Sequence, residues 1–190
     1  MSQLPDYARI HDLYESARFQ DIYRLTAPLW QHRALVALLD PRGLILAARV
    51  AHRLGNTRYY IALMRLAYER GKGTPYVEYY ARRVRARRES LFDELQHFAS
   101  RDAGTFGDPD LEASWLSTHA ALLAHVRDFE RAHDMMRQAY ARGQARSYVL
   151  SNHSQILQFE DRREEALEKA QQAWQASPGQ PYAGDALLRA

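Results

Sequence analysis

One sequence pattern occurs twice between residues 113 and 178, and this repetition constrains the fold more than any other feature. Identical or similar residues recur 34 positions apart, and no gap is needed to align the two copies. Within each copy, apolar residues return at helical spacing in two successive stretches. A fixed period of this length with two helical stretches per copy predicts stacked helix–turn–helix pairs. The anchoring pairs are Leu116 and Leu150, Leu123 and Leu157, Ala132 and Ala166, and Ala139 and Ala173.

The two copies resemble the tetratricopeptide repeat (TPR) family, whose helix pairs stack into an α-solenoid. The small residues at the anchoring positions and Pro178 after the second copy fit the family's pattern. Leu150 stands where the family usually has tryptophan, His153 replaces a leucine and Ala170 replaces an aromatic residue. The resemblance implies an all-α, TPR-like α-solenoid of antiparallel helix pairs that serves as a scaffold for protein–protein interaction.

The whole chain, residues 1–190, is predicted to be a single TPR-like domain with an irregular middle. Ala67–Gly71 is similar to Ala139–Gly143, but the two lie 72 residues apart, four more than two periods. An insertion is therefore expected after Gly71, and its apolar stripe fits either one long helix over 74–101 or two short helices. The predicted parts are 1–40 (a divergent repeat), 41–73 (a repeat), 74–112 (irregular), 113–146 and 147–180 (clear repeats) and 181–190 (the start of a further repeat).

Proline and its neighbours predict several helix boundaries. Asp40-Pro41, Thr74-Pro75 and Asp108-Pro109 each indicate a helix start, because the first residue can cap the helix and proline suits the first helical position. Pro28 is expected to kink or end a helix. Turns are expected near residues 17–18, 54–56, 127–128 and 160–161, and a possible helix division is expected near 88–90.

The net charge of +3 conceals an uneven distribution along the chain. Residues 1–40 carry a net −1, residues 41–90 carry twelve basic and three acidic side chains for a net +9, and residues 91–190 carry a net −5. Of the 26 lysines and arginines, only Lys72 and Lys169 are lysines, which indicates a GC-rich genome and favours a bacterial source. The basic middle of the chain is the part expected to attract an acidic partner.

The sequence contains none of the residue patterns that support catalysis or cofactor binding. It has no cysteine, no histidine pair at i, i+4 spacing, no phosphate-binding glycine loop and no Gly-x-Ser-x-Gly motif. We therefore expect no enzyme activity, no cofactor and no metal site within these residues. Neither a secretory leader nor an apolar stretch of membrane-spanning length is visible, so a cytoplasmic location is expected.

The repeat register of the family assigns a set of side chains to the concave groove. The N-terminal half of this groove is basic and aromatic, which favours an acidic protein or peptide partner, whereas the C-terminal half is neutral and includes Ser114, Ser117, Ala121 and Ala124. The clear repeats lack the lysine, asparagine and arginine with which the family clamps a C-terminal carboxylate. The predicted partner-binding residues are Arg42, Arg49, His52, Arg53, Tyr76, Tyr79, Arg83, Arg87, Tyr148, Gln155 and Phe159.

Other interpretations remain open at this point. The basic segment 41–90 with its interleaved tyrosines suits nucleic acid as a second choice of partner, although the neutral half of the groove argues against a long track. The chain also fits the accessory region of an enzyme whose catalytic domain lies elsewhere, and Arg82–Arg88 fits a solvated helix face. Because residues 181–190 stop in mid-helix at Leu187-Leu188, we expect that the natural chain continues and that this end self-associates.

Overall fold

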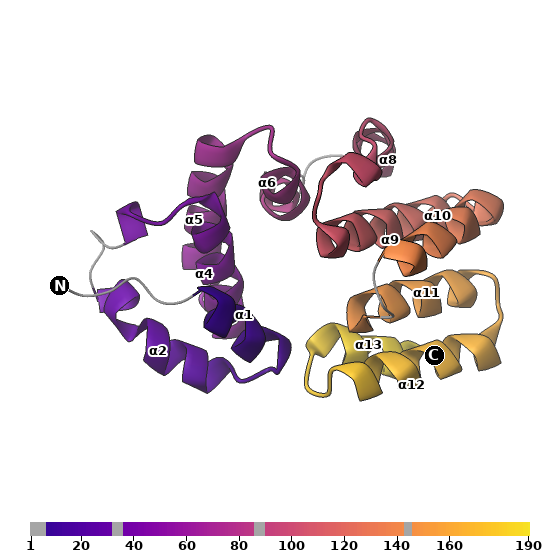
Figure 1. The fold of residues 1–190 in the computed structure, drawn as a ribbon. Coiled ribbons are helices and arrows are strands. Elements are labelled where there is room, and N and C mark those ends of the chain that lie inside the picture. The colour runs from indigo at the N-terminus through magenta and orange to yellow at the C-terminus, as the bar shows by residue number, and fades with distance from the viewer. Residues whose placement is uncertain (1–6, 32–35, 86–89, 143–145) are drawn as a thin grey trace. The chain divides into compact units, whose positions relative to one another are not determined.

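The computed structural model describes residues 7–31, 36–85, 90–142 and 146–190 (Figure 1). These residues form helices joined by turns and short loops, with no strand among them, which confirms the all-α prediction for this part of the chain. The chain divides into two compact units, residues 1–88 and residues 89–190. Within the described ranges, no helix combines the length and the apolar character needed to cross a lipid bilayer.

Unit 1 consists of two helical hairpins followed by two short helices. α4 is its central helix, because it packs against α1, α2, α5 and α6. Leu44, Ile45 and Ala48 on α4 are fully buried, and burial of a leucine or isoleucine side chain contributes about 1.5–3 kcal/mol. α2 continues past Pro28, so this proline does not end the helix. The helices are α1 (Tyr7–Glu15), α2 (Phe19–Gln31), α4 (Pro41–Arg53), α5 (Thr57–Gly71), α6 (Pro75–Tyr80) and α7 (Arg82–Arg85).

The last residue of α5, Gly71, lies tightly against the starts of α4 and α6. A Cβ atom at Gly71 would lie 2.9 Å from Cβ of Pro41 and 2.6 Å from Cγ2 of Val77, which is too close for any other residue without movement. The buried carboxylate of Glu78 accepts a hydrogen bond from the backbone N–H of Gly73 (3.0 Å). These contacts fix the position of α6 beside α4.

Unit 2 contains the two clear repeats. The hairpin of α9 and α10 is followed by the hairpin of α11 and α12; α11 also packs on α9, and α13 packs on both α11 and α12. α8 lies against α9, where the indole N–H of Trp115 donates to the backbone oxygen of Phe98 (3.1 Å). The elements are α8 (Leu91–Ala99), the 3₁₀ turn η2 (Ala103–Thr105), α9 (Pro109–His125), α10 (Phe129–Arg142), α11 (Ser147–Phe159), α12 (Arg163–Ala176) and α13 (Pro181–Arg189).

Small residues line the contact between the two helices of each hairpin in unit 2. Ala132 on α10 and its counterpart Ala166 on α12 are fully buried, as are Ala139 and Ala173. In the second hairpin the hydroxyl of Ser154 donates to the backbone oxygen of Ala166 (2.8 Å), a contact that requires close approach of the helices. The predicted burial of these repeat positions is confirmed, and a bulky side chain has no room there.

Both hairpins of unit 2 are closed by the same left-handed turn. Arg127 (φ 64°) and Asp161 (φ 60°) occupy equivalent positions 34 residues apart. In each turn the next residue donates its N–H to a carbonyl five residues earlier, at the buried leucine of the repeat: Leu123 (3.1 Å) in the first hairpin and Leu157 (2.9 Å) in the second. This is a Schellman-type helix end. The predicted turns near 127–128 and 160–161 are confirmed.

The hairpins of unit 1 close in the same way. Ala17 (φ 56°) and Gly55 (φ 80°) take the left-handed position, and each is followed by a residue that bonds back over five positions. Gly55 precedes Arg127 by 72 residues, the same distance that separates Ala67–Gly71 from Ala139–Gly143. The α4–α5 hairpin therefore corresponds to the α9–α10 hairpin in register at its turn.

The predicted helix starts before proline are all confirmed. The carboxylates of Asp40 and Asp108 cap α4 and α9 by accepting the backbone N–H three residues further on (2.7 and 3.1 Å). Thr74 precedes α6 without a side-chain cap, because its hydroxyl donates to the backbone oxygen of Gly71 (2.8 Å) instead.

The irregular middle of the chain is broken into short helices. α6 ends at Tyr80 and α7 covers only Arg82–Arg85, so one continuous helix over 74–101 is wrong. α8 starts immediately after Ser90, whose side chain and that of Asp93 form a reciprocal capping box. The start of α8 directly after Ser90 agrees with the later end of the expected division, whereas residues 88 and 89 lie outside the described residues; the break at Ala81 was not expected.

Candidate functional site

Three arginines lie along one face of α4 in unit 1. Arg42, Arg49 and Arg53 are seven and four residues apart, a spacing that brings them to the same side of a helix. The aliphatic side chains of α4, including Ile45 one turn before Arg49, are buried in the core, whereas Arg42 is exposed and Arg49 and Arg53 are half-buried. α1 and α6 flank α4 and supply aromatic side chains on either side of the arginines.

Arg49 lies between two tyrosine rings. Its guanidinium carbon is 4.1 Å from the ring centroid of Tyr14 on α1 and 5.0 Å from that of Tyr80 on α6. Both distances are within the range of favourable cation–π contacts, which contribute about 0.5–2 kcal/mol each depending on solvent access. The long arginine side chain is therefore held in one place by contacts from two other helices.

The stacking continues in both directions from Arg49. Arg53 lies over Tyr14 (5.9 Å) and Phe19 (5.8 Å), and its Nε–H donates to the Tyr14 hydroxyl (3.2 Å). On the other side the ring of Tyr80 contacts that of Tyr76 (4.8 Å), and Arg42 lies over Tyr76 (5.0 Å). We call this continuous set the arginine–tyrosine row; it comprises Phe19, Arg53, Tyr14, Arg49, Tyr80, Tyr76 and Arg42.

The row combines fixed positive charge with aromatic surface. Stacking occupies the flat face of a guanidinium, whereas its N–H groups lie in the plane and form paired hydrogen bonds to carboxylates or phosphates. The chemistry of the row thus suits recognition of an anionic group beside an aromatic or apolar one.

Not every predicted residue of the basic half belongs to the row. His52 lies to one side of the arginine face of α4. It is exposed, and its ring contacts that of Tyr60 on α5 (centroids 4.8 Å apart). Tyr79 borders the row through an edge-on contact with Tyr80 (4.7 Å). The side chain of Arg83 and the whole of Arg87 lie outside the described residues.

Three members of the row, Tyr14, Phe19 and Tyr80, were not among the partner-binding residues predicted from the sequence. All three fall in apolar stripes of their helices, so periodicity assigns them to the core. Tyr14 is indeed almost fully buried, but its ring face and hydroxyl meet Arg49 and Arg53. The sequence signal that identifies Tyr14 is the phenol itself, because a buried tyrosine hydroxyl needs a hydrogen-bonding partner.

The neutral half of the predicted groove is largely buried by helix packing within unit 2. Ser114, Ser117, Ala121 and Ala124 are buried, because α11 packs on α9, so the prediction that they line an open groove is wrong. Further along the same interface, α11 makes its own polar and ring contacts. The Tyr148 hydroxyl donates to the backbone oxygen of Asp110 (3.0 Å), Nε2 of Gln155 lies 3.4 Å from Nε2 of His125, and the Phe159 ring packs on the His125 ring (centroids 4.5 Å apart).

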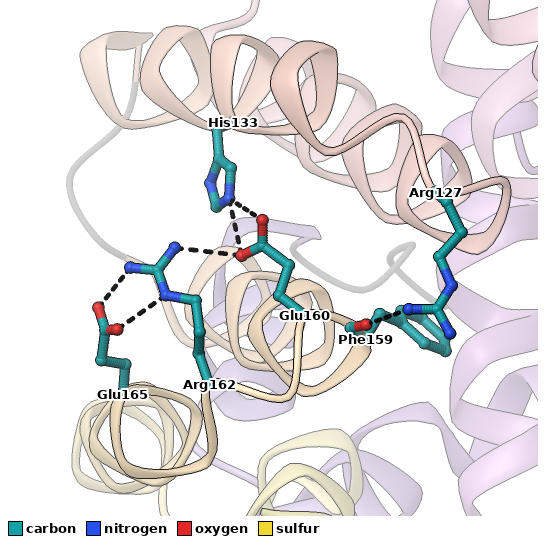
Figure 2. Close-up of polar contacts among 6 residues, drawn as sticks. All are labelled: Arg127, His133, Phe159, Glu160, Arg162 and Glu165. Carbon is teal, nitrogen blue, oxygen red and sulfur yellow. Dashed lines mark hydrogen bonds and ion pairs between the residues drawn. The ribbon is translucent and has the colours of Figure 1, made fainter.

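A polar cluster joins the two repeats of unit 2 (Figure 2). Nε2 of His133 on α10 lies 2.9 Å from both carboxylate oxygens of Glu160 in the next repeat's turn. Arg162 bridges Glu160 (3.1 Å) and Glu165 (2.6 and 2.7 Å). The Arg127 guanidinium donates to the backbone oxygen of Phe159 (2.6 Å), which ties the first turn to the end of α11.

His153 and Tyr140 form a half-buried pair beside this cluster. The Tyr140 hydroxyl and Nδ1 of His153 are 2.8 Å apart. Burial lowers the pKa of His153 to about 4, with Lys169 adding to the effect, and burial raises the pKa of Tyr140 to about 12. Both side chains are therefore neutral at pH 7, and the pair contributes hydrogen bonding to the packing of α10 on α11 rather than a reactive acid or base.

Neither a metal centre nor a known relative assigns a function to these features. Across the described ranges, histidine, aspartate and glutamate side chains do not converge in groups of three that could hold a metal ion. Comparisons of the chain with protein-family models, with curated proteins and with solved structures find no match.

Proposed function

We propose that this chain is a TPR-like helical-repeat protein that binds an acidic segment of a partner protein at the arginine–tyrosine row. The observation that carries the proposal is the position of Arg49 between Tyr14 and Tyr80, with Arg42 and Arg53 along the same helix face. The role is one of binding, with no catalytic step assigned to the chain.

The solenoid part of the proposal draws on the repetition of the hairpins. Each of the four hairpins ends its first helix with a left-handed residue and the same five-residue hydrogen bond. In unit 2 the first helix of one pair packs on the first helix of the next, which is the contact that stacks TPR-like repeats, and α13 continues the series against α11. Within such an arrangement the first helices, α1 and α4, carry the binding surface of unit 1.

An acidic peptide fits the row for an energetic reason. Arginine loses conformational entropy when it binds a ligand, but stacking has already restricted Arg49 and Arg53 in the unbound protein. A carboxylate that bonds to the in-plane N–H groups of a guanidinium contributes about 1.5–3 kcal/mol per charged hydrogen bond. The partly exposed rings of Tyr76 and Tyr80 supply apolar surface for the residues that lie between the acidic ones.

The test measures binding of a fluorescein-labelled peptide of alternating glutamate and tyrosine by fluorescence anisotropy. The row variant Arg42→Glu/Arg49→Glu is compared with the control Arg58→Glu/Arg65→Glu, which makes the same charge change at two exposed positions of α5 in the same unit. Loss of two charged contacts is expected to weaken binding more than about tenfold in the row variant. The control is expected to lose less than about threefold, because only long-range attraction changes.

The same titration separates peptide from nucleic acid. A fluorescein-labelled oligo-dT strand is measured in parallel from low to high salt, because binding to phosphates falls steeply with salt concentration. Tight and steeply salt-dependent binding of oligo-dT without peptide binding would replace the proposal with single-strand recognition. Equal losses in the row variant and the control, with both variants folded by circular dichroism, would show that the row is not a specific site.

A further inference from the structure

One leucine of α13 is exposed at a repeat position that is buried in the two preceding repeats. Leu188 is 87% exposed. It lies one period of 34 residues after Ser154 on α11 and two periods after Ala120 on α9. Both counterparts are fully buried in first helices that pack against the second helix of their own hairpin. Position 188 is therefore a helix-packing position that presents a large apolar side chain to solvent.

The exposed face of α13 carries two parallel rows of residues. Gly184 and Leu188 form an apolar row, and Asp185 and Arg189 form a charged row beside it. The members of each row are four residues apart, so they follow one another along the same side of the helix. The opposite side of α13 is buried against α11 and α12. The two rows thus form one surface that is directed away from the rest of unit 2.

Both rows have room for a partner. The side chains of Asp185 and Arg189 are exposed, and neither forms an ion pair within the part of the chain that the structure describes. In the apolar row, a Cβ atom added to Gly184 would meet Cζ3 of Trp174 at 3.5 Å, an ordinary van der Waals contact, and nothing closer. The Trp174 side chain is itself 39% exposed. An apolar side chain from outside can therefore lie beside Gly184 and pack on the Trp174 ring.

We propose that a second copy of this chain covers this face, with its α13 antiparallel to the first. A two-fold axis between the helices sets each row against the reversed copy of itself. Leu188 of each copy then lies beside Gly184 of the other, and Arg189 of each copy faces Asp185 of the other. Each contact occurs twice, so the face is complementary to itself in both shape and charge.

The expected dimer is weak, because one short helix supplies most of the contact. α13 has only nine residues, so the buried area falls below the roughly 1,200 Å² at which stable interfaces begin. We therefore expect a dissociation constant of about 10–100 µM. The surface belongs to unit 2 and shares no residue with the arginine–tyrosine row, so its test does not depend on peptide binding there.

Sedimentation equilibrium of the full chain from about 5 µM to about 500 µM measures the association. Leu188→Gln is expected to weaken it more than about tenfold, because the apolar contact is lost twice in each dimer. The control Phe92→Gln removes another exposed apolar side chain, on α8 of the same unit, and is expected to change the affinity less than about twofold. Gly184→Ala is expected to weaken dimerisation at least about threefold without destabilising α13, because alanine fills the space but favours the helix.

Charge reversal tests whether the partner is a second α13. Asp185→Arg and Arg189→Asp each place like charges opposite each other, so each variant alone is expected to associate at least about fivefold more weakly at low salt. Mixed in equal amounts, the two variants are expected to associate within about twofold of the wild type, because every arginine then faces an aspartate of the other chain. An ion pair within one helix cannot produce this recovery, since neither variant keeps opposite charges at the two positions.

The outcomes that would overturn the proposal are distinct. The wild-type chain could remain monomeric up to the highest concentration, or it could form assemblies larger than a dimer. Leu188→Gln and Phe92→Gln could have equal effects although both variants are folded by circular dichroism, which would assign the association to another surface. Failure of the mixed charge variants to recover the wild-type affinity would exclude the antiparallel α13 pair.

Discussion

Acidification is expected to destabilise unit 2 through His153. This ring is half-buried on α11, and the groups that face it are Tyr140 and His133 of α10, Lys169 of α12, and Arg162 and Glu160 at the turn. Burial and the nearby cations lower its pKa from 6.5 to about 4, and only Glu160 acts in the opposite direction. The folded protein therefore keeps His153 neutral at a pH at which the unfolded chain has already bound a proton.

The sign and size of the effect follow from proton linkage. Between pH 6.5 and pH 4 the unfolded state binds more protons, so the free energy of unfolding falls as the pH falls through this window. A pKa lowered from 6.5 to about 4 reduces the free energy of unfolding by about 3 kcal/mol once the pH lies below both pKa values. Solvent access to the half-buried ring reduces this loss to about 2 kcal/mol. About 1 kcal/mol of this is lost between pH 7.5 and pH 5.

Urea unfolding followed by tryptophan fluorescence measures this loss. A Trp30→Phe background leaves Trp115 and Trp174, both in unit 2, as reporters. His153→Gln is expected to flatten the pH dependence by about 1 kcal/mol between pH 7.5 and pH 5, whereas His125→Gln, at an exposed position, is expected to retain it. His119, whose pKa is also lowered by burial, contributes to the pH dependence in both variants. An unchanged slope in His153→Gln would refute the reasoning.

Three further predictions concern packing and capping. Replacing Ala132 or Ala166 with leucine is expected to lower the free energy of unfolding by about 1–3 kcal/mol through overpacking. The control Ala141→Leu, at an exposed position of α10, is expected to leave it unchanged. Unchanged melting temperatures for both buried variants would contradict the close helix contact. Ser90→Ala is expected to cost about 1 kcal/mol through loss of the capping box, seen as faster amide hydrogen exchange in α8. Tyr140→Phe is expected to lower the free energy of unfolding, measured in urea, by about 1–3 kcal/mol, because Nδ1 of His153 loses its hydrogen-bonding partner. An unchanged free energy of unfolding would mean that water replaces the hydroxyl.

The repeats were predictable because their signals are local or periodic. Ala132 and Ala166 are recognisable as close contacts from the 34-residue period alone, and Asp40 and Asp108 identify helix starts through chemistry confined to a few residues. The break at Ala81 was not predictable in this way. Its neighbours Tyr80 and Val84 fit one continuous apolar stripe, and only packing against the rest of unit 1 decides where the helix stops.

The binding surface was predictable only in part. Arg42, Arg49 and Arg53 share a helix face by spacing, so their grouping follows from the sequence. Their partners Tyr14 and Tyr80 come from other helices, and no pattern within one helix identifies such a contact. The burial of Ser117 and Ala124 likewise depends on how closely α11 approaches α9, which small residues permit but periodicity does not measure.

The recurrent left-handed turn has a consequence for how the chain folds during its synthesis. Each hairpin closes through a hydrogen bond that spans five residues, so little chain entropy is lost in bringing its two helices together. Contacts between residues close in sequence favour rapid folding. As the chain leaves the ribosome from its N-terminus, Ala17, Gly55, Arg127 and Asp161 emerge in that order, and each lets a helix pair form before the next is made. Apolar faces are then exposed to solvent one hairpin at a time rather than all at once.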